Sequence, residues 1–306
     1  MNWKISPIAL LFLVLPGCNS NSEVAEIVSQ NNRVVNATQL QIMFGNLDSG
    51  VTVIDFRKES QYKRGHIPGA INLWRSDIED PDSPLKGMMA GKKQMERLLQ
   101  DHGISPEDEL VVYDDNALCD AARFWWVMHY YNHQNVYLLN GGLSAWKAAG
   151  GDLSKETPLI MPSQYQLDEF ARNNELYISQ QELLEAMEED AVLIDARSPE
   201  EHSGEYQKKG AARAGRIPGS INVDWEQAVN FQGDKHFKSM EQLEELFGSL
   251  GLRKDQTIIV YCHSGVRSAH LTFVLTQLLG FENVRNYDGS WIEWSANPQL
   301  AVATDY

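Results

Sequence analysis

VIDFR at residues 53–57 and GHIPGAIN at 65–72 form a pattern that returns later in the chain, as LIDAR at 193–197 and GRIPGSIN at 215–222. The second motif starts at 65 in the first copy and at 215 in the second, 150 residues apart. A solenoid would instead stack several copies with a period of about 20–45 residues. The sequence therefore predicts a duplicated domain.

Each copy alternates short aliphatic runs with segments of helical periodicity. The runs are short, mainly aliphatic and do not alternate with polar residues, which is typical of parallel strands buried on both faces, and they span 51–55, 110–113, 136–139 and 257–261. Helical spacing follows at 121–131, 240–250 and 269–279. We therefore expect an α/β fold of two tandem domains, each a mainly parallel sheet with helices on both faces. The expected boundaries are a first domain at 34–150, a linker at 151–175 and a second domain at 176–306.

The composition limits the classes of partner. The chain has 306 residues, with 26 Lys and Arg against 42 Asp and Glu, for a net charge of −16. A surface this acidic repels phosphate backbones, so the sequence excludes nucleic acid as a partner, and a small anionic substrate would need a local positive pocket. The three cysteines, Cys18, Cys119 and Cys262, are too few for a disulfide scaffold, so each needs its own explanation.

The N-terminal segment has the features of a bacterial lipoprotein signal. Lys4 provides the positive start, a short apolar core follows it, and LPGC at the end of residues 1–18 resembles a lipobox. The core is shorter than the ~20 residues that span a bilayer. We expect a signal peptide at 1–18, a lipid on Cys18 and a polar tether at 19–33, which would anchor the protein in the cell envelope, facing the periplasm. Asn19 after the cysteine favours the outer membrane over the inner membrane. The alternatives to a lipoprotein signal are soluble export and a buried N-terminal helix.

A cysteine follows the fourth of these aliphatic runs. Cys262 comes directly after the expected strand at 257–261, and the short loop HSGVR at 263–267 leads to the expected helix. The unpaired N–H groups and the dipole of a helix N-terminus favour a thiolate and can hold an anion. Gly265 allows a tight turn, and Arg267 adds positive charge near the sulfur. The pattern predicts that Cys262 is a reactive nucleophile rather than a small buried hydrophobe.

Together these motifs resemble the two-domain rhodanese-type sulfurtransferases, the group that contains thiosulfate sulfurtransferase and 3-mercaptopyruvate sulfurtransferase. The resemblance covers residues 34–305 and rests on the duplicated pattern, on CHSGVR at 262–267 and on YDGSWIEW at 287–294. It implies that the Cys262 thiolate takes a sulfane sulfur from a small anionic donor, thiosulfate or 3-mercaptopyruvate, as a persulfide. A thiol or cyanide acceptor then removes that sulfur. The resemblance implies no metal and no organic cofactor.

The resemblance also implies a set of donor-binding residues, namely Arg197, His263, Ser264, Gly265, Val266 and Arg267. Ser264 is similar to the loop of mercaptopyruvate-type enzymes, whereas thiosulfate-type loops commonly place a lysine there. His263 departs from both types, and Arg267 is similar to single-domain rhodaneses, so the choice of donor stays open. For Arg197 the alternative to donor contact is an ion pair with Glu201.

Three further features have alternative interpretations. Asp114 stands in the first half where Cys262 stands in the second, so the first half is expected to be scaffold and cleft wall. Cys119 is expected to be an idle thiol, with a resolving or regulatory partner for Cys262 as the alternative. The insertion at 203–213 carries three cations. We expect it to be a solvated loop, with a lid or an electrostatic guide for anions as the alternative.

Two other functions compete with sulfur transfer. A phosphatase or arsenate reductase would use a similar cysteine–arginine loop, but the four residues at 263–266 are one too few to wrap a tetrahedral oxyanion. A catalytically idle binding protein of the cell envelope would have no use for Cys262 together with the glycine and arginine of its loop. Sulfur transfer is therefore the favoured hypothesis.

Overall fold

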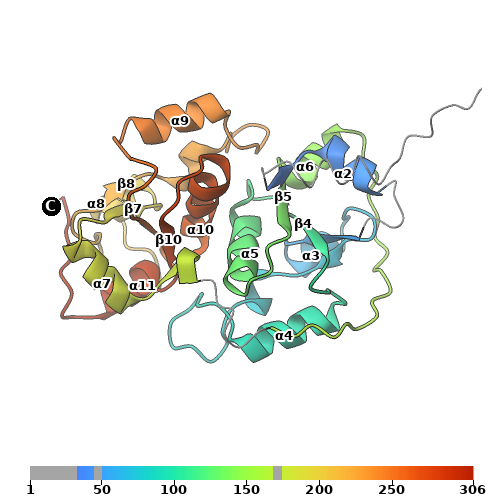
Figure 1. Cartoon of the computed structure of the whole chain (residues 1–306), viewed down its shortest axis with the longest axis horizontal. Coiled ribbons are helices and arrows are strands. Elements are labelled where there is room, and N and C mark those ends of the chain that lie inside the picture. The colour runs from blue at the N-terminus through green and yellow to red at the C-terminus, as the bar shows by residue number, and fades with distance from the viewer. Residues whose placement is uncertain (1–32, 45–49, 168–173, 306) are drawn as a thin grey trace, which may run out of the picture.

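The computed structural model describes residues 33–44, 50–167 and 174–305. The predicted signal peptide, Cys18 and the tether up to residue 32 lie outside these ranges. The chain forms two lobes, each built on a five-stranded sheet with parallel strands, as Figure 1 shows. The predicted α/β fold of two tandem domains is confirmed. Within the described ranges, no helix combines the length and the apolar character that a membrane crossing requires.

The first sheet has the strand order β1-β5-β4-β2-β3. Its strands are β1 (Val34–Val35), β2 (Val51–Asp55), β3 (Ile71–Asn72), β4 (Glu109–Tyr113) and β5 (Val136–Leu139). One face packs against α2 (Ala37–Phe44) and α6 (Gly142–Ala148), and the other against α4 (Lys92–Asp101) and α5 (Cys119–Tyr130). The connections on either side of β3 contain α3 (Glu59–Tyr62) and η1 (Arg75–Asp77).

The second sheet repeats this order as β6-β10-β9-β7-β8. Its strands are β6 (Tyr177–Ile178), β7 (Val192–Asp195), β8 (Ile221–Asn222), β9 (Ile258–Tyr261) and β10 (Val284–Tyr287). One face packs against α7 (Gln180–Glu188) and α11 (Ser290–Ala296), and the other against α9 (Met240–Gly248) and α10 (Val266–Phe273). Shorter helical segments are η2 (Asn174–Leu176), α8 (Pro199–Ser203), η3 (Trp225–Ala228) and η4 (Val274–Leu278).

The central strand β9 is apolar throughout because both of its faces are buried. Its Ile258 and Val260 belong to one core cluster, whereas Ile259 and Tyr261 belong to the cluster on the opposite face. Side chains of a strand alternate between the two faces of its sheet, so a strand covered by helices on both sides favours apolar residues at successive positions.

The two domains share one hydrophobic core. Helices α5 and α10 lie against each other in the centre of the molecule, between the two sheets (Figure 1). Trp125 of α5 meets Phe273 of α10 edge to face, with ring centroids 4.9 Å apart. A single cluster of buried residues runs from the first sheet through these helices to the second. The second domain, which the sequence predicts to be the catalytic one, thus packs against the first domain through α10 and α5.

Helix α10 begins earlier than the sequence pattern predicts. The expected start was at residue 269, but the helix begins at Val266 and continues after Phe273 as the π-helical turn η4. Gly265 precedes the helix with φ +77°, a left-handed conformation that suits glycine because it has no Cβ. Arg267 and Ser268 therefore lie in the first helical turn rather than in the loop.

Candidate active site

Cys262 lies directly after β9 and is 1% exposed. Its N–H donates to the Ser290 hydroxyl oxygen over 3.1 Å, and its carbonyl accepts the N–H of Trp291 over 3.0 Å. The hydroxyl of Ser268 donates to the Cys262 sulfur over 3.4 Å. The main chain of the cysteine is thus tied to α11, while its sulfur contacts the first turn of α10.

The surroundings of this sulfur favour the thiolate. Burial raises the pKa of the Cys262 thiol, but this effect is outweighed by the positive charge of Arg267, by the hydroxyl and N–H of Ser268 and by the N–H of Ser264. The pKa of Cys262 is therefore lower than its ordinary value of 9.0. Since the thiolate is the nucleophilic form of cysteine, this environment activates the side chain.

Arg267 is held in place by a carboxylate. Its two terminal nitrogens donate to the carboxylate oxygens of Glu201 over 2.5 and 2.9 Å. Glu201 lies on α8 and is 4% exposed, so the pair is largely shielded from water. A two-point contact of this kind fixes the orientation of the guanidinium plane. The alternative considered for Arg197 was an ion pair with Glu201; in the structure the ion pair of Glu201 is with Arg267, and that of Arg197 is with Asp195.

The turn at Gly265 is fixed from several sides. The Gly265 N–H donates to the Ser290 hydroxyl oxygen over 3.1 Å, and its carbonyl accepts the side-chain amide of Asn286 over 3.2 Å. A Cβ at this position would lie 2.7 Å from Arg123 Nη1 and 2.7 Å from Asp288 Oδ1. Glycine is therefore required here by the close packing as well as by the positive φ.

The first domain holds this loop through Arg123 of α5. Its guanidinium pairs with Asp288 over 2.6 Å and also donates to the Gly265 carbonyl over 3.3 Å and to the Gly87 carbonyl over 3.0 Å. Arg123 is 1% exposed. The other carboxylate oxygen of Asp288 accepts the N–H of Met89 over 3.0 Å. Residues of the first domain thus determine where the loop after Cys262 lies.

The cysteine lies in a cleft of about 450 Å³ that both domains line. The lining residues are Lys58, Trp74, Arg75, Asn116, Cys119, Asp120, Lys208, Trp225, Cys262, His263, Ser264, Val266 and Arg267. Four of these are cations and one is a carboxylate, in a chain of net charge −16. This is the local positive pocket that an anionic substrate needs. Among the described residues, no group of three or more His, Cys, Asp or Glu side chains is arranged to hold a metal ion.

Most of the predicted loop residues face this cleft. His263, Ser264, Val266 and Arg267 line it together with Cys262, whereas Gly265 is not among the lining residues. The His263 ring donates through Nε2 to the Lys209 carbonyl over 3.2 Å. Burial, and then the charge of Lys208, lower the pKa of His263 to about 4, so its ring is neutral near pH 7.

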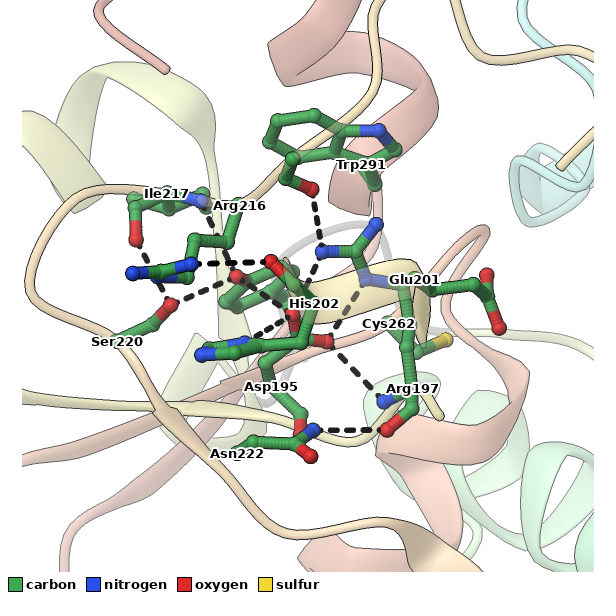
Figure 2. Close-up of polar contacts among 12 residues, drawn as sticks. Asp195, Arg197, Glu201, His202, Arg216, Ile217, Ser220, Asn222, Cys262 and Trp291 are labelled. Carbon is green, nitrogen blue, oxygen red and sulfur yellow. Dashed lines mark hydrogen bonds and ion pairs between the residues drawn. The ribbon is translucent and has the colours of Figure 1, made fainter. Parts of the chain in front are cut away.

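Arg197 lies outside the cleft lining. Its guanidinium donates to both carboxylate oxygens of Asp195, over 2.8 and 2.6 Å, and to the Gly215 carbonyl over 2.8 Å. Figure 2 shows this cluster, in which the guanidinium lies over the ring of Trp291, 4.7 Å from its centroid. In the first domain Arg57 makes the same bonds, to the carboxylate of Asp55 and to the carbonyl of Gly65. The contact of Arg197 with a donor stays a prediction.

Asp114 explains why the first domain lacks this chemistry. Its carboxylate accepts the N–H groups of Asn116 and Leu118 at one oxygen, over 2.9 and 2.8 Å, and those of Asp120 and Ala121 at the other, both over 2.9 Å. The amides at the start of α5 are therefore satisfied by a side chain of the chain itself. A donor anion has no free amide cradle at this position.

Cys119 shares the cleft but not the activation of Cys262. It is the first residue of α5 and is 3% exposed. Burial raises the pKa of Cys119 well above its ordinary value, and the carboxylates of Asp120 and Asp114 raise it further. Cys119 is thus held as a thiol, and its role stays a prediction.

Most of the residues that support the loop were not predicted from the sequence. Arg123 was a candidate for reaching the cleft, with packing or surface pairing as the alternatives, and it lies outside the cleft lining. Ser268, Asp288 and Ser290 were not assigned a role. Ser290 has φ +51°, a strained conformation for serine, and its hydroxyl accepts the N–H groups of both Cys262 and Gly265. The YDGSW stretch was a signal that could have identified two of these residues, because it includes Asp288 and Ser290.

Comparison with known proteins identifies the family. The model of the rhodanese-like domain matches residues 37–149 and 179–297. The chain belongs to the rhodanese family. The sulfur carrier protein TtuD of Thermus thermophilus is 38% identical and is aligned over 76% of this chain and 83% of its own length. A thiosulfate sulfurtransferase of Corynebacterium glutamicum is 35% identical over 89% of this chain and 90% of its own.

Solved structures of EanB share the same architecture. A variant of EanB in complex with ergothioneine has a TM-score of 0.81 and 25% sequence identity, over 91% of this chain and 71% of EanB. The anaerobic ergothioneine biosynthesis enzyme from Chlorobium limicola, in complex with trimethyl histidine, has a TM-score of 0.78 and 26% identity, over 91% of this chain and 72% of its own. Another EanB structure contains a cysteine persulfide. The rhodanese-family relatives therefore support sulfurtransferase chemistry at this site.

Proposed function

We propose that this rhodanese-family chain is a sulfurtransferase that moves a sulfane sulfur from thiosulfate or 3-mercaptopyruvate to cyanide or a thiol. The sulfur would be carried as a persulfide on Cys262. One observation carries the proposal: a cysteine with a lowered pKa lies in a cleft that cations from both domains line. Named sulfurtransferases among the relatives support the same chemistry.

The proposed reaction needs only the residues already described. The Cys262 thiolate attacks the outer sulfur of thiosulfate, a new S–S bond forms, and the S–S bond of the donor breaks. Sulfite leaves with the electron pair of that bond. The amides of Ser264 and Ser268, which favour the thiolate, would favour the negative charge of the persulfide in the same way. An acceptor nucleophile then takes the outer sulfur and restores the Cys262 thiolate.

Sulfur transfer to cyanide from each donor tests the proposal. The unaltered protein should be active with at least one donor, and Cys262→Ser should lose at least about a thousandfold in kcat, because the persulfide cannot form. Intact-mass analysis after donor treatment should show one added sulfur atom that cyanide removes. Activity that persists in Cys262→Ser would contradict the assignment. Hydrolysis of an aryl phosphate, with no activity on either sulfur donor, would favour the phosphatase alternative.

We further propose that the chain is lipid-anchored at Cys18 in a bacterial cell envelope, facing the periplasm. The support is the sequence pattern of residues 1–18, since these residues lie outside the described part. Expressed in a bacterial host, the unaltered protein should sediment with membranes, and Cys18→Ser should appear in the soluble fraction. Recovery of both proteins in the same fraction would contradict an anchor at Cys18.

A further inference from the structure

We propose that Lys208 selects the donor of this site, and that its ammonium group binds the oxyanion end of a small inorganic dianion such as thiosulfate. This inference rests on the proposed sulfur transfer and names the donor class. Lys208 belongs to the insertion at 203–213. The corresponding connection in the first domain is shorter and lacks this segment.

The insertion is anchored to the second domain. Arg213 donates to the main-chain carbonyls of Ser295, Leu300 and Asn297 over 2.9, 2.8 and 2.7 Å. The indole N–H of Trp291 donates to the Arg213 carbonyl over 2.9 Å. One end of the insertion is therefore fastened to α11 and to the segment that follows it.

The part of the insertion around Lys208 is held as well. The Tyr206 N–H donates to the Glu200 carbonyl over 2.9 Å, and the Ala211 N–H donates to the Lys208 carbonyl over 3.2 Å. The His263 ring donates to the Lys209 carbonyl. These bonds place Lys208 beside the loop that follows Cys262, so its position does not depend on a bound donor.

The Lys208 ammonium group makes no direct ion pair within the described ranges, and the opposite charges that act on it from a distance are those of Glu201, which is bonded to Arg267, and of the Cys262 thiolate. Arg267 is paired with Glu201, and Arg75 lies 3.2 Å from Glu79. Within the described ranges, no hydrogen bond or ion pair involves the Lys208 side chain, although it lines the cleft. The Lys208 side chain is exposed; partial desolvation and then the charge of Arg267 lower its pKa, whereas the charges of Glu201 and Cys262 raise it. A bound anion would offset the repulsion between Lys208 and Arg267.

The contribution of Lys208 to donor binding should depend on the charge of the donor. Thiosulfate has two negative charges, and it approaches a thiolate that repels it. 3-Mercaptopyruvate carries a single carboxylate. Because the Coulomb energy scales with the product of the charges, removing the ammonium should weaken thiosulfate use more than mercaptopyruvate use. Two of the four cations of the cleft thus have separable roles, with Arg267 at the sulfur and Lys208 at the donor oxyanion.

Steady-state kinetics with both donors tests this assignment in Lys208→Met, Lys208→Arg and Lys209→Met. Lys209→Met is the matched control, because it removes the same charge from the same segment and keeps the main-chain carbonyl that His263 uses. Lys208→Met should raise KM for thiosulfate at least tenfold and lower the thiosulfate-to-mercaptopyruvate ratio of kcat/KM at least fivefold. Lys208→Arg should restore most of the loss, and Lys209→Met should stay within twofold of the unaltered protein.

Thiosulfate binding to the Cys262→Ser protein, measured by calorimetry, gives a readout that needs no turnover. Adding Lys208→Met to this protein should weaken binding at least tenfold, and adding Lys209→Met should not. Equal binding by the two double variants would overturn the role of Lys208. An unchanged donor ratio in Lys208→Met would overturn donor selection. If the unaltered protein transfers sulfur from neither donor, the proposed function is wrong, and the binding comparison still decides whether Lys208 holds the anion.

Discussion

The two thiols of the cleft show how neighbouring charges decide the chemistry of a single residue. Burial raises the pKa of both Cys262 and Cys119 and is the largest effect on each. Next to Cys262 the second effect is the cation of Arg267, whereas next to Cys119 it is the carboxylate of Asp120. The pKa is therefore lowered for the first sulfur and raised for the second. One cleft thus contains an activated thiol and an inactive one.

The pH dependence of alkylation should follow Arg267. The iodoacetamide rate at Cys262 should rise with pH through an inflection below 9.0, because only the thiolate reacts. Removing the nearby cation should move this inflection upward by roughly 1–3 pH units. Combining Arg267→Met with Glu201→Gln avoids an unpaired buried carboxylate, and peptide mass spectrometry separates Cys262 from Cys119. An inflection that does not move in this double variant would contradict the role of Arg267.

Asp114 should be a major source of stability in the first domain. Asp114→Ala leaves four N–H groups without their acceptor; three of them are buried, and each buried group costs about 1–3 kcal/mol. Urea denaturation should therefore show a loss of at least about 3 kcal/mol. Asp115→Ala is the control, because Asp115 is exposed and its ion pair with Arg57 should contribute about 1 kcal/mol or less. Similar losses in the two variants would contradict the account.

At the scale of elements, the N-terminus of α10 and the middle of α5 form one unit. Arg123 of α5 bonds the carbonyl that precedes α10 and the carboxylate of Asp288, which follows β10. The amides that favour the Cys262 thiolate are therefore positioned by a side chain of the other domain. The first domain is more than a scaffold, since it sets the geometry of the catalytic loop.

Arg123→Met should impair catalysis without removing any group that faces the cleft. We expect kcat/KM to fall at least tenfold and the inflection for Cys262 alkylation to move upward, because the loop amides lose their alignment. Arg123→Met with Asp288→Asn separates this effect from the instability of an unpaired buried carboxylate. Arg64→Met removes an exposed arginine of the same domain and should change neither value. If the pH inflection of the Cys262 alkylation rate does not change in this variant, the role of Arg123 is only structural.

At the scale of the whole molecule, the shared core should make the two domains unfold together. Phe273→Ala removes a fully buried ring from the junction of α5 and α10 and should cost about 3–5 kcal/mol. Calorimetry should show a single transition that moves to lower temperature. Phe44→Ala, at a ring that is 37% exposed, should cost about 1 kcal/mol or less. Two separate transitions in the unaltered protein would contradict a shared core.

Local patterns in the sequence were enough to predict four of the longer strands and the loop that follows Cys262. The bounds of β2 and β5 agree with the aliphatic runs at 51–55 and 136–139, because burial on both faces leaves a continuous apolar signature. Cys262 was identifiable because strand, cysteine, glycine and helix are adjacent in the chain. The start of α10 was missed because a left-handed glycine begins the helix before its apolar periodicity becomes visible.

The sequence by itself determined the duplication and the pattern of the longer strands and singled out Cys262 as the candidate nucleophile, because each of these depends on residues close together in the chain or on a repeated motif. Only the tertiary structure decided the partners of the charged side chains. Arg267 pairs with Glu201, 66 positions away, and Arg123 reaches the Gly265 carbonyl across 142 positions. Which partner an arginine meets depends on how segments that are distant in the sequence pack together, within one domain for Arg267 and between two domains for Arg123, and local sequence does not specify that packing.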